Sequence, residues 1–98
     1  FFSPEATYHN IPVDPVVGVD AIRATIAAFT AGVESMVFEM VNISAHGDTV
    51  LTERVDYFNY PGLTVSLPVM GTFELRDGKI AAWRDYFDLN QFMSQLGG

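Results

Sequence analysis

Cysteine is absent from this 98-residue sequence, and cationic residues are few. Without cysteine there is no disulfide, no thiol nucleophile and no cysteine-ligated metal. The lysines and arginines are also scattered, at Arg23, Arg54, Arg76, Lys79 and Arg84. They leave a formal net charge of −7, with no basic stripe for a phosphate backbone and no basic amphipathic segment for an anionic membrane. We therefore expect neither nucleic acid nor a membrane as a partner.

Long apolar runs are also lacking, and no signal peptide is visible, so we expect a cytoplasmic protein. The 49% hydrophobic content and the length predict one folded domain over residues 1–98. The sequence has no initiator Met, and Phe1-Phe2-Ser3-Pro4 reads like the end of an element already under way. We therefore expect the domain to be N-terminally incomplete and to lack a preceding helical segment.

The order of predicted elements indicates an α+β fold. Hydrophobic periodicity and turn signals predict a strand over 6–12, a helix over 18–31, strands over 35–45, 49–60, 63–76 and 80–88, and a short helix from about residue 90. Such an order predicts a cone-shaped domain in which a curved antiparallel or mixed sheet packs against helices. Folds of this shape open a pocket between the sheet and the helices.

A carboxylate interrupts the apolar face of the last predicted strand. In the strand 63–76 one face is apolar, with Leu63, Val65, Leu67, Val69, Phe73 and Leu75. In its hairpin partner, Asp85 falls between Trp83 and Phe87 in the register that should be buried. An unpaired buried carboxylate costs several kcal/mol, so Asp85 must be protonated or must hold a cation.

The strand 49–60 offers that cation, because Arg54 and Asp56 share one face. One guanidinium can fork to both Asp56 and Asp85, and two carboxyls sharing one proton can supply a general acid and a general base. Two plainer interpretations stay open. An Arg-x-Asp pair on a strand is most often a solvated surface pair, and a buried Asp85 is as consistent with a structural salt bridge as with catalysis.

The remaining polar candidates give weaker signals. Tyr8 and Asn10 share a register on the first strand, where polar residues usually decorate an edge. His9 and His46 lack the second ligand that metal spacing requires, so we expect surface or turn positions and no metal site. The residues alone therefore predict a pocket that contains an Asp-Arg-Asp candidate.

Three segments resemble the limonene-1,2-epoxide hydrolase family and its bacterial relatives in the SnoaL-like, NTF2-like superfamily. They are Thr52-Glu-Arg-Val-Asp56, the stretch from Asp77-Gly-Lys-Ile80 to Trp83-Arg-Asp-Tyr-Phe-Asp-Leu89, and Tyr8-His-Asn10 followed by Ile11-Pro12. The first two together are fairly specific, whereas the third alone is weak. The resemblance runs over nearly the whole chain.

The resemblance implies a role for each of five residues. Asp85 would be the general base on a water that Tyr8 and Asn10 also hold. Asp56 would be the general acid that protonates the epoxide oxygen, and Arg54 would bridge both carboxylates. Attack would be direct, with no covalent intermediate, no metal and no cofactor.

The same resemblance implies a substrate and an assembly. The substrate would be a small to medium hydrophobic epoxide that yields a vicinal diol, and the protein would be a homodimer. Family members carry further helices ahead of the first strand, and these close one end of the pocket. The apolar pocket would be lined by Phe29, Phe38, Phe58, Leu67, Val69, Phe87 and Phe92.

Two other functions share this fold class. A ketosteroid-isomerase-like or polyketide-cyclase-like enzyme has no need for an arginine between two acids, so Arg54 counts against it. A non-catalytic module that stores an apolar ligand has no need for an oriented water, so Tyr8 and Asn10 count against that.

Overall fold

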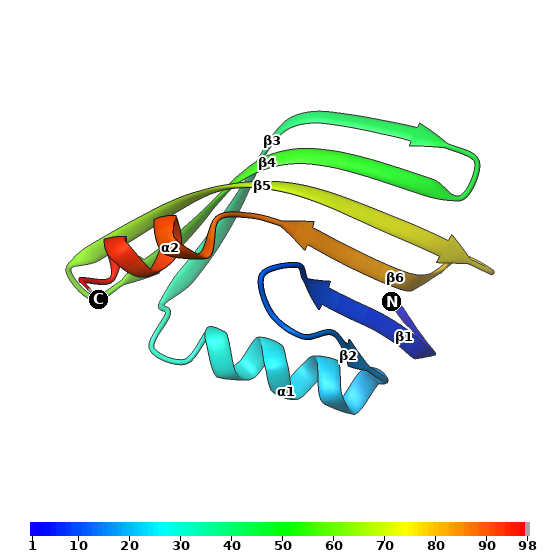
Figure 1. The fold of residues 1–98 in the computed structure, drawn as a ribbon, viewed down its shortest axis with the longest axis horizontal. Helices are drawn as coiled ribbons and strands as arrows, with labels where there is room; N and C mark the ends of the chain where they lie inside the picture. The colour runs from blue at the N-terminus through cyan, green and yellow to red at the C-terminus, as the bar shows by residue number, and fades with distance from the viewer. Residues whose placement is uncertain (98) are drawn as a thin grey trace.

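The computed structural model describes residues 1–97. Within them a curved sheet of six strands packs against two helices (Figure 1). The elements in chain order are β1 (Phe2–Asn10), β2 (Val16–Val17), α1 (Val19–Phe29), β3 (Ser35–His46), β4 (Thr49–Tyr60), β5 (Leu63–Arg76), β6 (Lys79–Tyr86) and α2 (Leu89–Gln95). The α+β class predicted from the sequence is confirmed.

The sheet has the strand order β2-β1-β6-β5-β4-β3. Strands β3 to β6 form the predicted antiparallel meander, and β1 then pairs in parallel with β6. The parallel pairing makes the sheet mixed, and it brings the first and last strands of the chain side by side (Figure 1). Side chains from both ends of the sequence can therefore share one face of the sheet.

Several predicted boundaries were wrong. Strand β1 begins at Phe2 rather than at residue 6 and ends at Asn10, because Ile11 and Pro12 belong to the turn that follows. The two-residue strand β2 was missed, since it is too short to show a period. Strand β6 ends at Tyr86 rather than at residue 88, because Asp88 instead caps helix α2.

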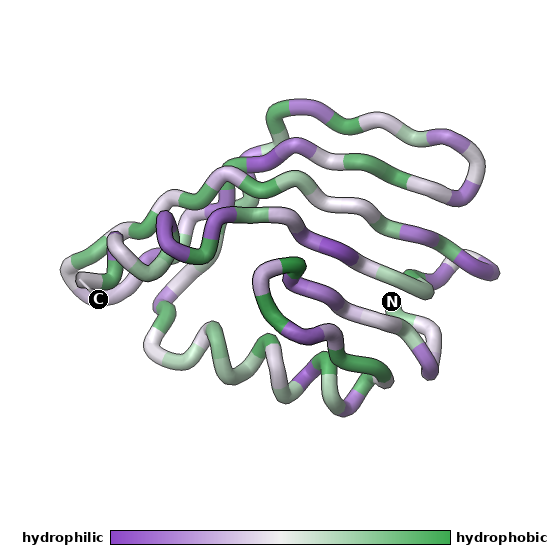
Figure 2. The backbone as a smooth tube through the Cα atoms, viewed as in Figure 1, coloured by the Kyte–Doolittle hydropathy of each residue, from purple (hydrophilic) through white to green (hydrophobic). Residues whose placement is uncertain are grey.

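The two helices cover the concave face of the sheet at different places. Helix α1 packs against β1 and β2, and its buried Ile22 meets Ala6 and Tyr8. Helix α2 packs against β5, where the Gln95 amide binds the backbone of Ser66 through two hydrogen bonds of 3.0 and 2.7 Å. Figure 2 shows apolar and polar residues interspersed along the helices and the strands.

The core consists of two apolar clusters on the concave face. One contains Phe58, Val65, Leu67 and Val69, and the other contains Ala6, Tyr8 and Ile22. Leu63 was predicted to share the buried face of β5, but it lies at the start of the strand and is exposed. In the part of the chain that the structure describes, no helix combines the length and the apolar composition needed to span a bilayer.

Candidate active site

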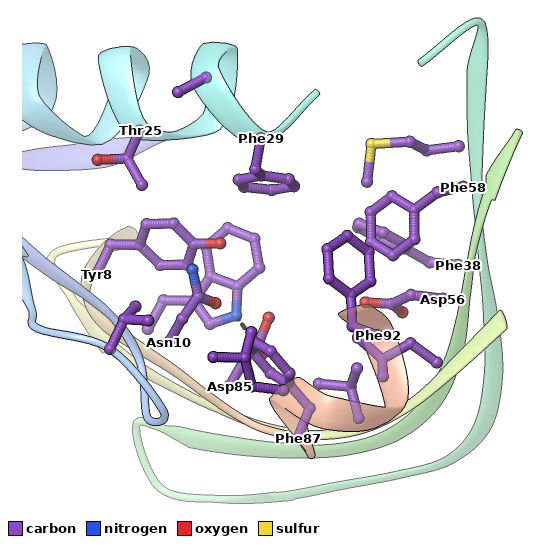
Figure 3. A pocket seen from close by; sticks show the side chains of 17 residues that line it. Tyr8, Asn10, Thr25, Phe29, Phe38, Asp56, Phe58, Asp85, Phe87 and Phe92 are labelled. Atoms are coloured by element: carbon purple, nitrogen blue, oxygen red, sulfur yellow. Dashed lines mark hydrogen bonds between the residues drawn. The ribbon is translucent and has the colours of Figure 1, made fainter. Parts of the chain in front are cut away.

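A cavity of about 490 Å³ opens between the concave face of the sheet and the two helices. Figure 3 shows Tyr8, Asn10 and Asp85 gathered on one side of it, with Asp56 beside Phe58 on the other. All seven apolar residues predicted from the resemblance lie on its wall. Its polar lining includes Tyr8, Asn10, Asp56 and Asp85.

The Arg54 guanidinium lies between the two carboxylates and is 3% exposed. Its Nε and Nη2 donate to the two oxygens of Asp56 at 3.0 and 2.9 Å. Its Nη1 and Nη2 donate to the two oxygens of Asp85 at 3.2 and 3.0 Å. Nη1 also donates to Thr52 Oγ1 at 3.2 Å, so all five N–H bonds of the guanidinium have an acceptor.

Burial of this group is compatible with charge because each charge has partners. Burial by itself lowers the pKa of Arg54, but the hydrogen bonds to Asp56 and Asp85 outweigh it, and the net pKa is raised. Arg54 therefore stays protonated at every working pH. A buried ion pair with this many hydrogen bonds keeps its charges fixed in place, whereas a broken one would leave a costly unpaired charge.

Gly71 makes the close approach of these groups possible. It lies on β5 between Arg54 on β4 and Asp85 on β6, and it pairs directly with Asp85 and with Thr52. A Cβ atom at this position would lie 2.5 Å from Arg54 Nη1, 2.7 Å from Asp85 Oδ1 and 2.8 Å from Thr52 Oγ1. Because Gly71 has no side chain, the Arg54 guanidinium has room to cross β5 and reach Asp85 on β6.

Among residues 1–97, the Asp85 carboxylate has one hydrogen-bond donor besides Arg54. The indole Nε1 of Trp83 donates to Asp85 Oδ1 at 2.7 Å, which is the dashed line in Figure 3. Burial raises the pKa of Asp85, the hydrogen bonds from Arg54 and Trp83 oppose the rise, and the charge of Asp56 adds to it. The net pKa is raised, so the carboxylate is a stronger base than an ordinary aspartate.

Tyr8 and Asn10 reach the site through the parallel pairing of β1 with β6. Tyr8 pairs with Trp83, and Asn10 pairs with Asp85. Burial raises the pKa of Tyr8 to about 12, although the neighbouring Asn10 side chain opposes the rise. Tyr8 therefore keeps its proton at neutral pH and can donate a hydrogen bond.

The apolar wall is built mainly from phenylalanines. Phe58 meets Phe29 and Phe92 edge-on, with ring centroids 6.3 and 5.4 Å apart, so β4 joins α1 to α2 across the cavity. The Phe38 ring lies 5.2 Å from the Arg54 Cζ, close enough for a cation–π contact. Further lining residues, which were not predicted to line the pocket, are Val13, Thr25, Ala28, Met36, Trp83 and Leu89.

The structure thus brings together Tyr8, Asn10, Arg54, Asp56 and Asp85, whose catalytic roles stay predictions. Sequence reasoning missed Thr52, Gly71 and the Trp83 indole as supporting groups. The signal for Gly71 was present, since a glycine interrupts an otherwise apolar face of β5. Among residues 1–97, no group of three or more His, Asp or Glu side chains is arranged to hold a metal ion.

The family model described as the limonene-1,2-epoxide hydrolase catalytic domain matches residues 2–97. The epoxide hydrolase EphG of Mycobacterium tuberculosis is 46% identical over 54 residues, which are 55% of this chain and 36% of that protein. The chain therefore aligns with about a third of the length of this relative.

Solved structures agree with this comparison. The structure of an LEH-like epoxide hydrolase from M. tuberculosis superposes with a TM-score of 0.79 and 33% identity, covering 97% of this chain and 71% of that one. A protein described as a SnoaL-like polyketide cyclase from Jannaschia sp. CCS1 superposes with a TM-score of 0.86 but only 20% identity, covering 99% and 74%. This second likeness shows the shared fold alone.

Proposed function

The chain belongs to the limonene-1,2-epoxide hydrolase family, and on that premise we propose that it hydrolyses small to medium hydrophobic epoxides to vicinal diols in one step. The observation that carries the proposal is the Arg54 guanidinium, which is hydrogen-bonded to two buried carboxylates at the wall of an apolar cavity. No cofactor or metal ion takes part in the proposed reaction.

In the proposed reaction a water molecule lies against Asp85, Tyr8 and Asn10. Asp85 takes one proton from it as its oxygen bonds to an epoxide carbon. The ring C–O bond breaks, and Asp56 gives its proton to the departing oxygen, so the product is an uncharged diol. The two carboxyls share one proton, which the step leaves on Asp85, and its return to Asp56 through solvent resets the pair for the next turnover.

The roles of the supporting groups follow from the same geometry. Ring strain resides in the epoxide, so the protein needs only to place the water, accept its proton and neutralise the opening oxygen. Arg54 holds both carboxylates within reach of one substrate, and its donors are all in use there. It therefore acts by positioning the acid and the base rather than by contacting the epoxide.

The cavity supports an apolar substrate of limited size. Its wall is formed mainly by aromatic and aliphatic side chains, and Arg54 links the two acids, Asp56 and Asp85, that line it. A cyclase-like or isomerase-like enzyme of this fold would have no need for an arginine between two acids, and among residues 1–97 the one buried cation, Arg54, is held there.

Diol formation from a panel of hydrophobic epoxides, with limonene oxide and cyclohexene oxide included, tests the proposal. The parent should produce diol, and Asp85→Asn should lose at least about a hundredfold in kcat/KM, the scale expected on removal of a general base. Tyr57→Phe, on the opposite face of β4, is the matched control and should keep the parent rate. A folded parent that forms no diol would refute the hydrolase proposal.

We also propose that the protein is a homodimer, in keeping with its small core. The convex face of the sheet exposes large apolar side chains, and a second copy of the chain would cover them. They are Val37, Leu51, Met70 and Tyr86. Light scattering on the parent and on Leu51→Glu checks the dimer, because the variant should shift the mass towards the monomer. Cell fractionation checks the expected cytoplasmic location.

A further inference from the structure

The two oxygens of Asp85 have different surroundings. Oδ1 accepts from Arg54 Nη1 at 3.2 Å and from Trp83 Nε1 at 2.7 Å. Oδ2 accepts from Arg54 Nη2 at 3.0 Å. A carboxylate oxygen has two lone pairs, so both acceptor positions of Oδ1 are occupied and Oδ2 keeps one.

We propose that Trp83 is a positioning residue that selects Oδ2 as the atom of Asp85 that receives the proton of water. The inference rests on the proposed hydrolysis and adds to it an atom and a further residue. With the indole N–H in place, a proton on Oδ1 would displace a hydrogen bond, whereas a proton on Oδ2 displaces none. The water must therefore approach from the side of Oδ2.

The surroundings of Trp83 hold the indole in this orientation. Its ring lies 4.7 Å from the ring of Tyr8 and stacks on Phe73 at 5.1 Å. The contact with Tyr8 also couples the indole to the residue proposed to hold the same water. The stack fixes the ring plane, and the ring plane directs the N–H towards Asp85.

The indole N–H also affects when Asp85 is ionised. The charged and titratable groups that act on Asp85 are Arg54 and Asp56 on β4 and Tyr8 on β1. Trp83 adds an uncharged donor that binds the ionised form and so opposes the rise in the pKa of Asp85 that burial causes. Loss of the N–H should leave Asp85 protonated at a higher pH.

The variant Trp83→Phe keeps an aromatic ring in the stack and removes only the donor. Its kcat/KM should fall about tenfold to a hundredfold, the range for a hydrogen bond to a charged group, and the acidic limb of the pH profile should move to higher pH. Phe73→Leu loosens the stack that orients the indole, so its acidic limb should move in the same direction but less far. Tyr57→Phe, on the opposite face of β4, should leave the limb where the parent has it. An unmoved limb in Trp83→Phe would overturn the proposal.

A second measurement tests the chosen oxygen without any need for activity. Trp83 is the sole tryptophan of the chain, so its indole gives one ¹H–¹⁵N signal. During a pH titration, followed in parallel by the Asp85 carboxyl ¹³C signal, the indole proton should stay downfield because Oδ1 keeps accepting. A large upfield shift as Asp85 protonates would place the proton on Oδ1 and overturn the proposal.

The kinetic measurement and the NMR titration separate a failure of the proposed function from a failure of the proposal on Trp83. Absence of diol from the parent would count against the hydrolase function but would leave the indole titration valid. If Trp83→Phe fails to fold, the titration of the parent still decides which oxygen takes the proton.

Discussion

Replacing Gly71 by alanine tests whether Arg54 and Asp85 can pack together only because this position of β5 has no side chain. Gly71 has an ordinary extended backbone, because its φ is not among the positive values. Alanine therefore fits the backbone, and removing a glycine from a strand interior should by itself stabilise the fold by roughly 0.5–1 kcal/mol. Backbone propensity and the packing of the site thus predict changes of opposite sign in the free energy of unfolding.

Packing should decide the outcome. The new Cβ would lie 2.5 Å from Arg54 Nη1 and 2.7 Å from Asp85 Oδ1, so one of these buried groups must move. Overpacking of this kind costs about 1–3 kcal/mol, which exceeds the gain in propensity. A displacement of about 1 Å at catalytic groups can lower the rate a hundredfold, so we expect kcat/KM for epoxide hydrolysis to fall by about that factor.

The assay combines a thermal melt with diol formation. A net loss of about 1 kcal/mol corresponds to a Tm lower by roughly 4–8 °C in a domain of this size. Thr72→Ala, which changes the adjacent residue on the opposite face of β5, is the control and should change both quantities little. A Gly71→Ala protein that melts no lower than the parent and keeps its activity would refute the reasoning.

Three further predictions concern the same site and its wall. Thr52→Val should lower kcat/KM about tenfold, because it leaves one Arg54 N–H without an acceptor, whereas Thr52→Ser should keep most of the rate; equal rates in the two variants would contradict this. The activity of the parent should fall as the pH drops through the raised pKa of Asp85, since the base must be ionised, and a rate–pH profile flat down to the ordinary aspartate range would contradict it. Asp88→Ala should destabilise helix α2 by about 1 kcal/mol, because the Asp88 carboxylate caps the backbone N–H groups of Asn90 and Gln91. As α2 carries Phe92 to the cavity, KM should rise more than kcat falls, which steady-state kinetics on an apolar epoxide would show.

The sequence was most informative where the strand period is regular. The alternation in β5 and β6 placed Asp85 on the concave face, and the spacing of two residues placed Arg54 and Asp56 together on β4. The structure shows these three side chains buried and hydrogen-bonded. The predicted element order was also sufficient for the fold class, because an antiparallel meander leaves few ways to arrange its strands.

Other features were not predictable from the period of single strands. The parallel pairing of β1 with β6 depends on long-range contacts, and only this pairing brings Tyr8 and Asn10 beside Trp83 and Asp85. The indole bond to Asp85 depends on a ring orientation that Phe73 and Tyr8 impose from neighbouring strands. Tertiary packing determines such contacts, and the secondary-structure propensity of a single strand does not predict them.

The pairing of β1 with β6 also bears on how the protein folds. These strands are far apart in the sequence, so their contacts close a loop that contains most of residues 1–97. Contacts of such high sequence separation form slowly, because the entropy of closing the loop is lost before any contact compensates for it. During synthesis β1 leaves the ribosome long before β6 exists, and a meander of β3 to β5 can form without it. The two halves of the water-binding site are therefore expected to meet among the last events of folding.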